Sequence, residues 1–157
     1  MKMIFCVFLL VVTALITFGQ TEHRSVMKTA KGTFEVKVTP VKDDEASAVD
    51  GLGRLVINKT WVGDMAGTSK GQMLGSSDAK QTTGGYVAME IFSGNLHGKK
   101  GSFGLQHNGT MGNGKFDLNI EVIPGSGTGE LKDISGQLVI IIEKGKHSYE
   151  LSYTLPN

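Results

Sequence analysis

The stretch FDLNIEV, residues 116–122, alternates apolar and polar side chains without interruption. Because successive side chains of an extended chain point to opposite faces, one face of this stretch is apolar and the other is polar. Such alternation is typical of a β-strand that buries one face. The stretch therefore predicts a strand, and the same pattern recurs in both directions along the chain.

Several other segments share the two-residue period, namely residues 34–39, 55–61, 103–107 and 149–155. Pairs that favour tight turns separate the segments: Asp50-Gly51, Gly84-Gly85, Asn113-Gly114 and Lys144-Gly145. Residues 41–49 and 76–83 read as loops. With no helical period after residue 28, about eight strands predict an all-β domain, either a sandwich or a barrel.

The run of residues 138–142, LVIII, departs from this alternation because both of its faces are apolar. It indicates a strand that is covered on both sides or that lies at a subunit contact. The second interpretation predicts that the protein forms a homo-oligomer.

The N-terminus has the composition of a secretory signal peptide, with Lys2 ahead of an apolar run at 3–18 and a polar sequence from Gln20. The apolar run is shorter than the ~20 residues of a spanning helix. We predict cleavage after Gly19, a flexible segment at 20–28, a domain at 29–157, and export to the periplasm or the extracellular space. No stable membrane span is expected after cleavage.

Cleavage also changes what the mature chain can do. Loss of Lys2 leaves 15 basic residues against 15 acidic ones, and Cys6 is the only cysteine of the chain. A net charge of zero offers no broad attraction to nucleic acid, so no nucleic-acid partner is expected. Disulfides, thiol catalysis and cysteine-bound zinc are excluded for the mature protein.

Four strings together resemble the DUF3224 family of small single-domain proteins of unknown function. They are AKGTFEVKVTP from Ala30, GGYVAMEIFSGNLHGKKGSFGLQHNGTM from Gly84, VIPGSGTGELKDISGQLVI from Val122 and GKHSYELSYTLP from Gly145. The resemblance covers nearly all of residues 29–156 and implies a closed antiparallel barrel of about eight strands, similar in fold to the allene oxide cyclase barrel. It favours the barrel over the sandwich and implies no activity.

Two candidate catalytic residues lie on predicted strands. His107 is in phase with Phe103 and Leu105, so it points into the interior, either as a proton carrier or as a hydrogen-bonded core residue. Glu90 shares a face with Tyr86, and the sequence leaves open whether that face is inside or outside. If it is inside, we expect a desolvated carboxylate with a raised pKa that can act as a base.

Candidate ligand-binding residues are Lys59, Trp61, Glu90 and His107. Lys59 lies on the face of Leu55, Ile57 and Trp61, where an amine can bind an acidic headgroup with Trp61 as an apolar wall. Alternatively, Lys59 lies near the rim, covering apolar surface with its stem while its charged head reaches water.

The glycine-rich string PGSGTG, residues 124–129, does not fit a phosphate loop, because no Lys-Ser/Thr pair completes it and no helix follows. It reads as a tight connection between strands or a barrel corner. The histidines lack a second ligand at metal-binding spacing, so we expect no metal site and no cofactor.

Three functions remain open at this stage. The first is a barrel that binds a small, mainly apolar ligand in a mouth lined by Trp61, His107 and Lys59. The second is an isomerase or cyclase that uses Glu90 or His107, suggested only by the fold relative. The third is a structural protein that forms homo-oligomers. Whether the protein is an enzyme is undecided by the sequence.

Overall fold

The computed structural model describes residues 25–42, 49–80 and 82–156. The predicted signal peptide lies outside these residues and stays a prediction. Within these ranges the chain forms eight strands: β1 (Lys28–Pro40), β2 (Gly53–Gly63), β3 (Met65–Ser77), β4 (Gly84–Leu96), β5 (Lys99–Gly112), β6 (Lys115–Val122), β7 (Ser135–Glu143) and β8 (Lys146–Thr154). One short 3-10 helix, η1 (Gly129–Leu131), lies between β6 and β7.

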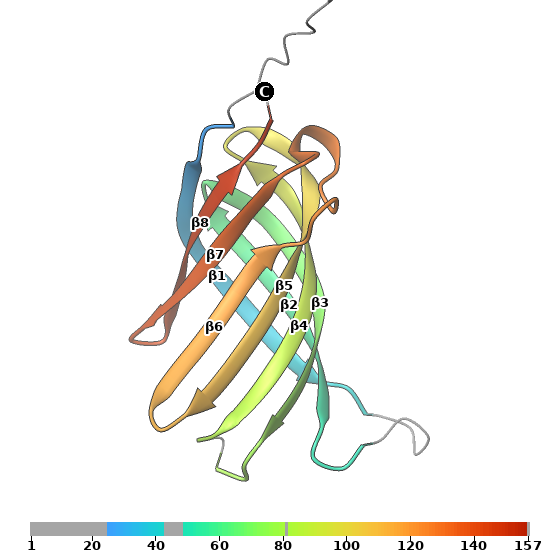
Figure 1. Cartoon of the computed structure of the whole chain (residues 1–157), viewed down its shortest axis with the longest axis vertical. Coiled ribbons are helices and arrows are strands. Elements are labelled where there is room, and N and C mark those ends of the chain that lie inside the picture. Colours follow the sequence, from blue (N-terminus) through green and yellow to red (C-terminus); the bar gives the residue numbers. More distant parts are fainter. Residues whose placement is uncertain (1–24, 43–48, 81, 157) are drawn as a thin grey trace, which may run out of the picture.

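The strands form a closed antiparallel barrel in chain order, with β1 pairing both β2 and β8 (Figure 1). The barrel closes because β1 pairs with a different strand on each of its two edges: with β8 over residues 28–34 and with β2 over residues 32–40. The prediction of a closed all-β barrel is therefore confirmed. Among the described residues, no helix is long and apolar enough to span a membrane.

Two tight turns follow predicted glycine pairs. Asn113 and Gly114 between β5 and β6 both have positive φ, 52° and 71°. Lys144 and Gly145 between β7 and β8 have φ of 51° and 77°. Two consecutive residues with positive φ match the right-handed twist of the strands that they join.

Loop boundaries differ slightly from the sequence-based expectation. Ser76 and Ser77, predicted to be loop, extend β3, because they pair with Gly85 and Gly84 of β4. The prediction of a turn at Gly84-Gly85 was therefore wrong, since this pair begins β4. The strand β1 begins at Lys28, one residue before the predicted domain. Of the loop predicted at 41–49, residues 43–48 lie outside the described part of the chain.

One half of the barrel interior is tightly packed. Trp61 lies against Phe34 and Tyr149, with ring centroids 4.7 Å and 5.2 Å apart, and Phe92 lies against Phe103 at 5.1 Å. The connection between β6 and β7 closes this end of the barrel. It buries Leu131, the last residue of η1, and Ile134, which follows η1. The glycine-rich string is thus part of a strand connection, and the single turn η1, which starts at its last residue, is the only helical element from there to the end of the described chain.

The run 138–142 is buried on one side only. Leu138 faces the core, while Val139 and Ile141 on the outer face are 58% and 40% exposed. The first of the two interpretations, a strand covered on both sides, is not met within the described residues, because none of them forms a second layer over the outer face of β7. The alternative of a subunit contact stays a prediction.

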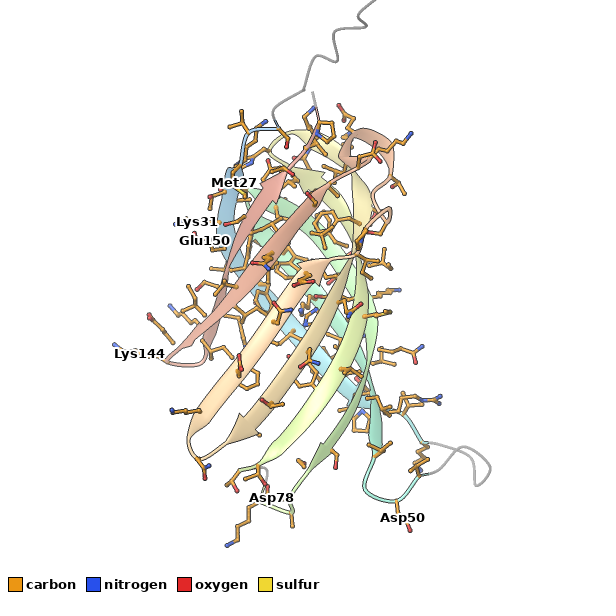
Figure 2. The ribbon with its side chains drawn as sticks, in the orientation of Figure 1. Met27, Lys31, Asp50, Asp78, Lys144 and Glu150 are labelled. Carbon is orange, nitrogen blue, oxygen red and sulfur yellow. The ribbon has the colours of Figure 1, made fainter. Side chains whose placement is uncertain are left out.

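Figure 2 draws the side chains on the ribbon and labels Lys31 and Glu150, which lie next to each other. Lys31 of β1 and Glu150 of β8 form an ion pair of 2.8 Å across the strand junction that closes the barrel. Because both side chains are well exposed, the pair contributes little to stability. The energy of closure therefore comes mainly from the interior.

Candidate functional site

A buried polar cluster crosses the middle of the barrel interior and joins β2, β3, β4 and β5. Its residues are Lys59, Ser69, Glu90 and His107, and all four are at most 6% exposed. Because a buried charge without partners is costly, such a cluster has to be satisfied internally.

Glu90 is the centre of the cluster and accepts three hydrogen bonds. Its Oε1 lies 2.6 Å from Lys59 Nζ and 3.0 Å from His107 Nε2, and its Oε2 accepts a hydrogen bond of 2.8 Å from Ser69 Oγ. Ser69 Oγ in turn accepts a hydrogen bond of 2.9 Å from Trp61 Nε1. Both carboxylate oxygens are therefore engaged.

The pairing register explains why Glu90 can point inward. Gly71 of β3 is its direct partner across the strand pair, and a Cβ at position 71 would lie 2.5 Å from Glu90 Cβ. Only glycine leaves room for the carboxylate at this point. The residues on the opposite face of β4, Val87, Met89 and Ile91, are about half exposed.

The pKa of Glu90 is lowered, whereas the sequence-based expectation was a raised pKa. Burial alone would raise the pKa of Glu90, but the hydrogen bond from His107 and the charge and hydrogen bond of Lys59 lower that pKa to about 2. The predicted raised pKa was wrong because the sequence did not show that Lys59 and Ser69 also reach this carboxylate. Glu90 is a stable anion at neutral pH and a weak base.

Lys59 carries the matching positive charge. Burial lowers the pKa of Lys59, and the carboxylate of Glu90 offsets part of this effect. The Nζ atom also lies 5.1 Å from the ring centroid of Phe34 and 5.0 Å from that of Trp61, within the range of cation–π attraction. The interpretation of Lys59 as a rim residue with its head in water was wrong.

The tautomer of His107 follows from its partner. An ionised carboxylate only accepts hydrogen bonds, so His107 donates through Nε2–H to Glu90. In the neutral imidazole, Nδ1 is then an acceptor. The expectation that His107 points inward with Phe103 and Leu105 is confirmed, because all three are buried.

A cavity of about 150 Å³ lies directly against this cluster. Lys59, His107 and Phe34 line it on the side of the packed half, and its remaining walls are mainly apolar. A wider hollow of about 590 Å³ occupies the mouth of the barrel and shares three lining residues with the cavity: Met73, Tyr86 and Phe116. The polar cluster therefore forms the floor of an apolar space that leads to the mouth.

Residue size makes this end of the barrel hollow. Gly75, Gly84 and Gly109 take interior positions near the mouth, and a Cβ at position 109 would lie 2.5 Å from the Tyr86 ring. The same strand faces carry Phe92 and Phe103 in the packed half. The Tyr86 ring takes the space over Gly109, and the other glycines of the mouth contribute no side chain that would fill the hollow.

The barrel wall is also open on one side of this space. Between β6 and β7 a single residue pair, Glu121 with Gln137, is registered, whereas β7 pairs with β8 along its whole length. Phe116 and Ile142 are 52% and 57% exposed although they follow the inward face of their strands. The inner wall is therefore accessible along this side, where Figure 1 shows β6 diverging from β7 and β8.

The comparisons with known proteins place this arrangement in a family. The model of a family described as "Protein of unknown function (DUF3224)" matches residues 30–153. The chain belongs to the DUF3224 family. The predicted resemblance is thus confirmed over almost the same residues.

A solved structure of another DUF3224 protein, from Shewanella oneidensis MR-1 and described as a protein with unknown function, is similar to this chain. The two share 42% sequence identity with a TM-score of 0.75, over 84% of this chain and 100% of the other. No curated protein matches the chain. The DUF3224 assignment therefore supports the barrel and leaves the activity to be argued from the site.

The structure brings together all four predicted site residues and adds three. Lys59, Glu90 and His107 meet at the cavity floor, while Trp61 packs behind Lys59 and bonds Ser69 without lining the cavity. Sequence reasoning missed Ser69, Phe34 and Gly71. The alternation of Gly67, Ser69 and Gly71 on one face of a strand was the available signal for Ser69.

Proposed function

We propose that this DUF3224 barrel binds a small, mainly apolar ligand inside its hollow half. The observation that carries the proposal is a cavity with mainly apolar walls and a polar floor of Lys59 and His107, in a barrel whose other half is filled by a cluster of buried side chains. Apolar pockets with a few fixed polar groups are the usual form of small-molecule sites. A barrel that served only as a scaffold would gain stability by filling this space.

The accessible inner wall supports the same function. Apolar side chains that are about half exposed in water cost free energy, and a ligand lying against Phe116 and Ile142 would remove that cost. The hollow mouth and the open side between β6 and β7 both offer a path to the floor. A ligand can therefore enter without unfolding the packed half.

Native mass spectrometry of protein purified from its own host without detergent tests the proposal. We expect a species heavier than the polypeptide by one small molecule, and we expect Leu118→Trp to remove it. Leu118 lines the cavity, so a larger side chain there fills the space. Asn119→Trp is the matched control, because the neighbouring position is exposed on the outer face.

Loss of the added mass in both variants, or in neither, would contradict a site in the lumen. A wild-type protein that carries no added mass in its host and gains none from an extract of host lipids and metabolites would contradict ligand binding altogether.

Isomerase or cyclase chemistry is a second candidate, favoured by one observation. His107 lines the cavity and is oriented by the carboxylate of Glu90, as the histidine of many acid–base sites is oriented by a carboxylate. With a pKa of about 2, Glu90 itself is a poor base at neutral pH. Turnover in this site would therefore depend on His107, and His107→Gln would abolish the turnover while retaining ligand binding.

A further inference from the structure

The charges at the floor of the cavity already cancel before any ligand enters. Lys59 and Glu90 form an ion pair of 2.6 Å, and their side chains are 5% and 0% exposed. Among the described residues, Lys59 has no other acidic residue within ion-pair distance, and Glu90 has no other lysine or arginine within that distance. The Lys59–Glu90 pair is therefore neutral as a whole, and it gives the floor hydrogen-bonding groups without a net charge.

The spare hydrogen-bonding capacity at the floor lies on Lys59. An ammonium group has three donors, and among the described residues Lys59 makes one hydrogen bond, to Glu90. Glu90 is engaged through both oxygens, and the Trp61 N–H is used by Ser69. Tyr86 and His147 also line the cavity, but within the polar cluster Lys59 is the main donor left for a ligand.

We infer that the ligand carries an uncharged hydrogen-bond acceptor, such as the carbonyl oxygen of a ketone, aldehyde or ester, and that Lys59 Nζ binds it. The inference rests on the proposed ligand-binding function and specifies its ligand. A carboxylate would bring a second negative charge next to Glu90 with only one cation between them, and it would lose its hydration in an apolar cavity. A hydrocarbon would leave the donors of Lys59 unsatisfied.

The sequence-based hypothesis of an acidic headgroup on Lys59 therefore gives way to a neutral one. An acid would suit a lysine without a carboxylate partner, whereas this lysine has Glu90 at 2.6 Å. The body of the ligand is flat or slender, because the space beside the floor is about 150 Å³ and a cavity of this size accommodates a molecule such as benzene. The wider mouth takes the remainder of the molecule.

Three naphthalene derivatives of similar shape test the inference: methyl naphthyl ketone, naphthoic acid and ethylnaphthalene. They differ in carrying a neutral acceptor, a carboxylate or no acceptor. Their dissociation constants at neutral pH can be measured by the change in their own fluorescence with the full wild-type chain. We expect the ketone to bind about tenfold more tightly than ethylnaphthalene, as one added hydrogen bond to a charged group implies, and naphthoate to bind more weakly than the ketone.

Two variants test whether the preference for the ketone over the other two probes depends on the Lys59–Glu90 ion pair. In Lys59→Met we expect the ketone to lose its advantage over ethylnaphthalene. In Glu90→Gln the positive charge of Lys59 has no counter-charge, so we expect naphthoate to become the tightest of the three. Lys37→Met is the control, because Lys37 is exposed on the outer face of β1, and it leaves all three constants unchanged.

The outcomes separate the two proposals. Equal binding of the ketone and ethylnaphthalene by the wild type would keep the lumen site and overturn the role of Lys59. Tighter binding of naphthoate would overturn the inference in favour of an acidic ligand. Absence of binding by all three probes would overturn both the site and the inference. The wild-type comparison decides the question even where a variant fails to fold.

Discussion

The two halves of this barrel are made of the same eight strands and differ in what fills them. In the half closed by η1, Trp61, Phe92 and Tyr149 are at most 2% exposed and contact other aromatic rings. In the half that opens at the mouth, glycines take interior positions and Phe116 is 52% exposed. The difference shows that period-two patterning determines the strands and their inner faces, while residue size determines which part of the barrel is a core.

The polar cluster lies where these halves meet, and its position has a physical reason. A buried ion pair needs rigid neighbours to hold its geometry, and the packed rings of Phe34 and Trp61 supply them on one side of Lys59. The hollow half supplies the space on the other side. A charged pair at such a boundary is held in place, and Lys59 is still accessible from the cavity.

The largest expected effect contrasts an aromatic residue of each half. Trp61→Ala removes a fully buried ring and its bond to Ser69, so we expect a loss of about 4 kcal/mol in the free energy of unfolding. Phe116→Ala removes a ring that is already half exposed, and we expect a loss of about 1 kcal/mol or less. Urea denaturation measures both; similar losses would show that the hollow half is packed after all.

The next effect concerns the ion pair at the boundary. Glu90→Gln leaves Lys59 buried without a counter-charge, and we expect a loss of about 3 kcal/mol at neutral pH. The double variant Lys59→Met, Glu90→Gln removes both charges and recovers most of this loss. Urea denaturation of the two variants and of Lys59→Met completes the double-mutant cycle; additive losses would contradict direct coupling of the two residues.

The low pKa of Glu90 predicts a specific acid sensitivity. A carboxyl whose folded pKa of about 2 is below its ordinary value of 4.5 stabilises the fold above the ordinary value, and this stability is lost as pH falls toward 2. The shift corresponds to at most about 3 kcal/mol between these pH values. Glu90→Gln should flatten this part of the pH profile of the unfolding free energy, whereas an unchanged slope would assign the acid sensitivity to other carboxylates.

The smallest expected effect is on the outer face. Val139 and Ile141 are exposed on β7, so Val139→Lys should change the unfolding free energy by less than about 0.5 kcal/mol. If this face is the predicted subunit contact, the wild type sediments as an oligomer and Val139→Lys as a monomer. A wild type that sediments as a monomer at high concentration would exclude the homo-oligomer.

Much of the fold could be predicted from the sequence because strand alternation and turn glycines are local signals. Neighbouring residues alone determine which side chains share a face in residues 116–122 and 149–155. They also determine the turns at Asn113-Gly114 and Lys144-Gly145, and the barrel has both as predicted. The choice of a closed barrel depended on the family resemblance, since alternation alone fits a sandwich equally well.

The site could be predicted only in part, because its properties depend on contacts between distant strands. The register of Glu90 was undecided from sequence since both faces of YVAMEIF contain apolar residues. The structure shows that Glu90 points inward and that its partner on β3 is Gly71, which has no side chain to block it. The low pKa of Glu90 arises from residues 17 and 31 positions away, His107 and Lys59, whose meeting is a product of the whole barrel.

The most direct test of the whole account is a titration of the wild-type chain with methyl naphthyl ketone, followed by NMR of the methyl groups. We predict that the methyl signals of Leu118 and Ile140, which line the cavity, shift with saturation, while those of Leu151 in the packed half and Val139 on the outer face do not. Shifts confined to Val139 and its surface neighbours, or no shifts at all, would contradict a ligand site in the hollow half.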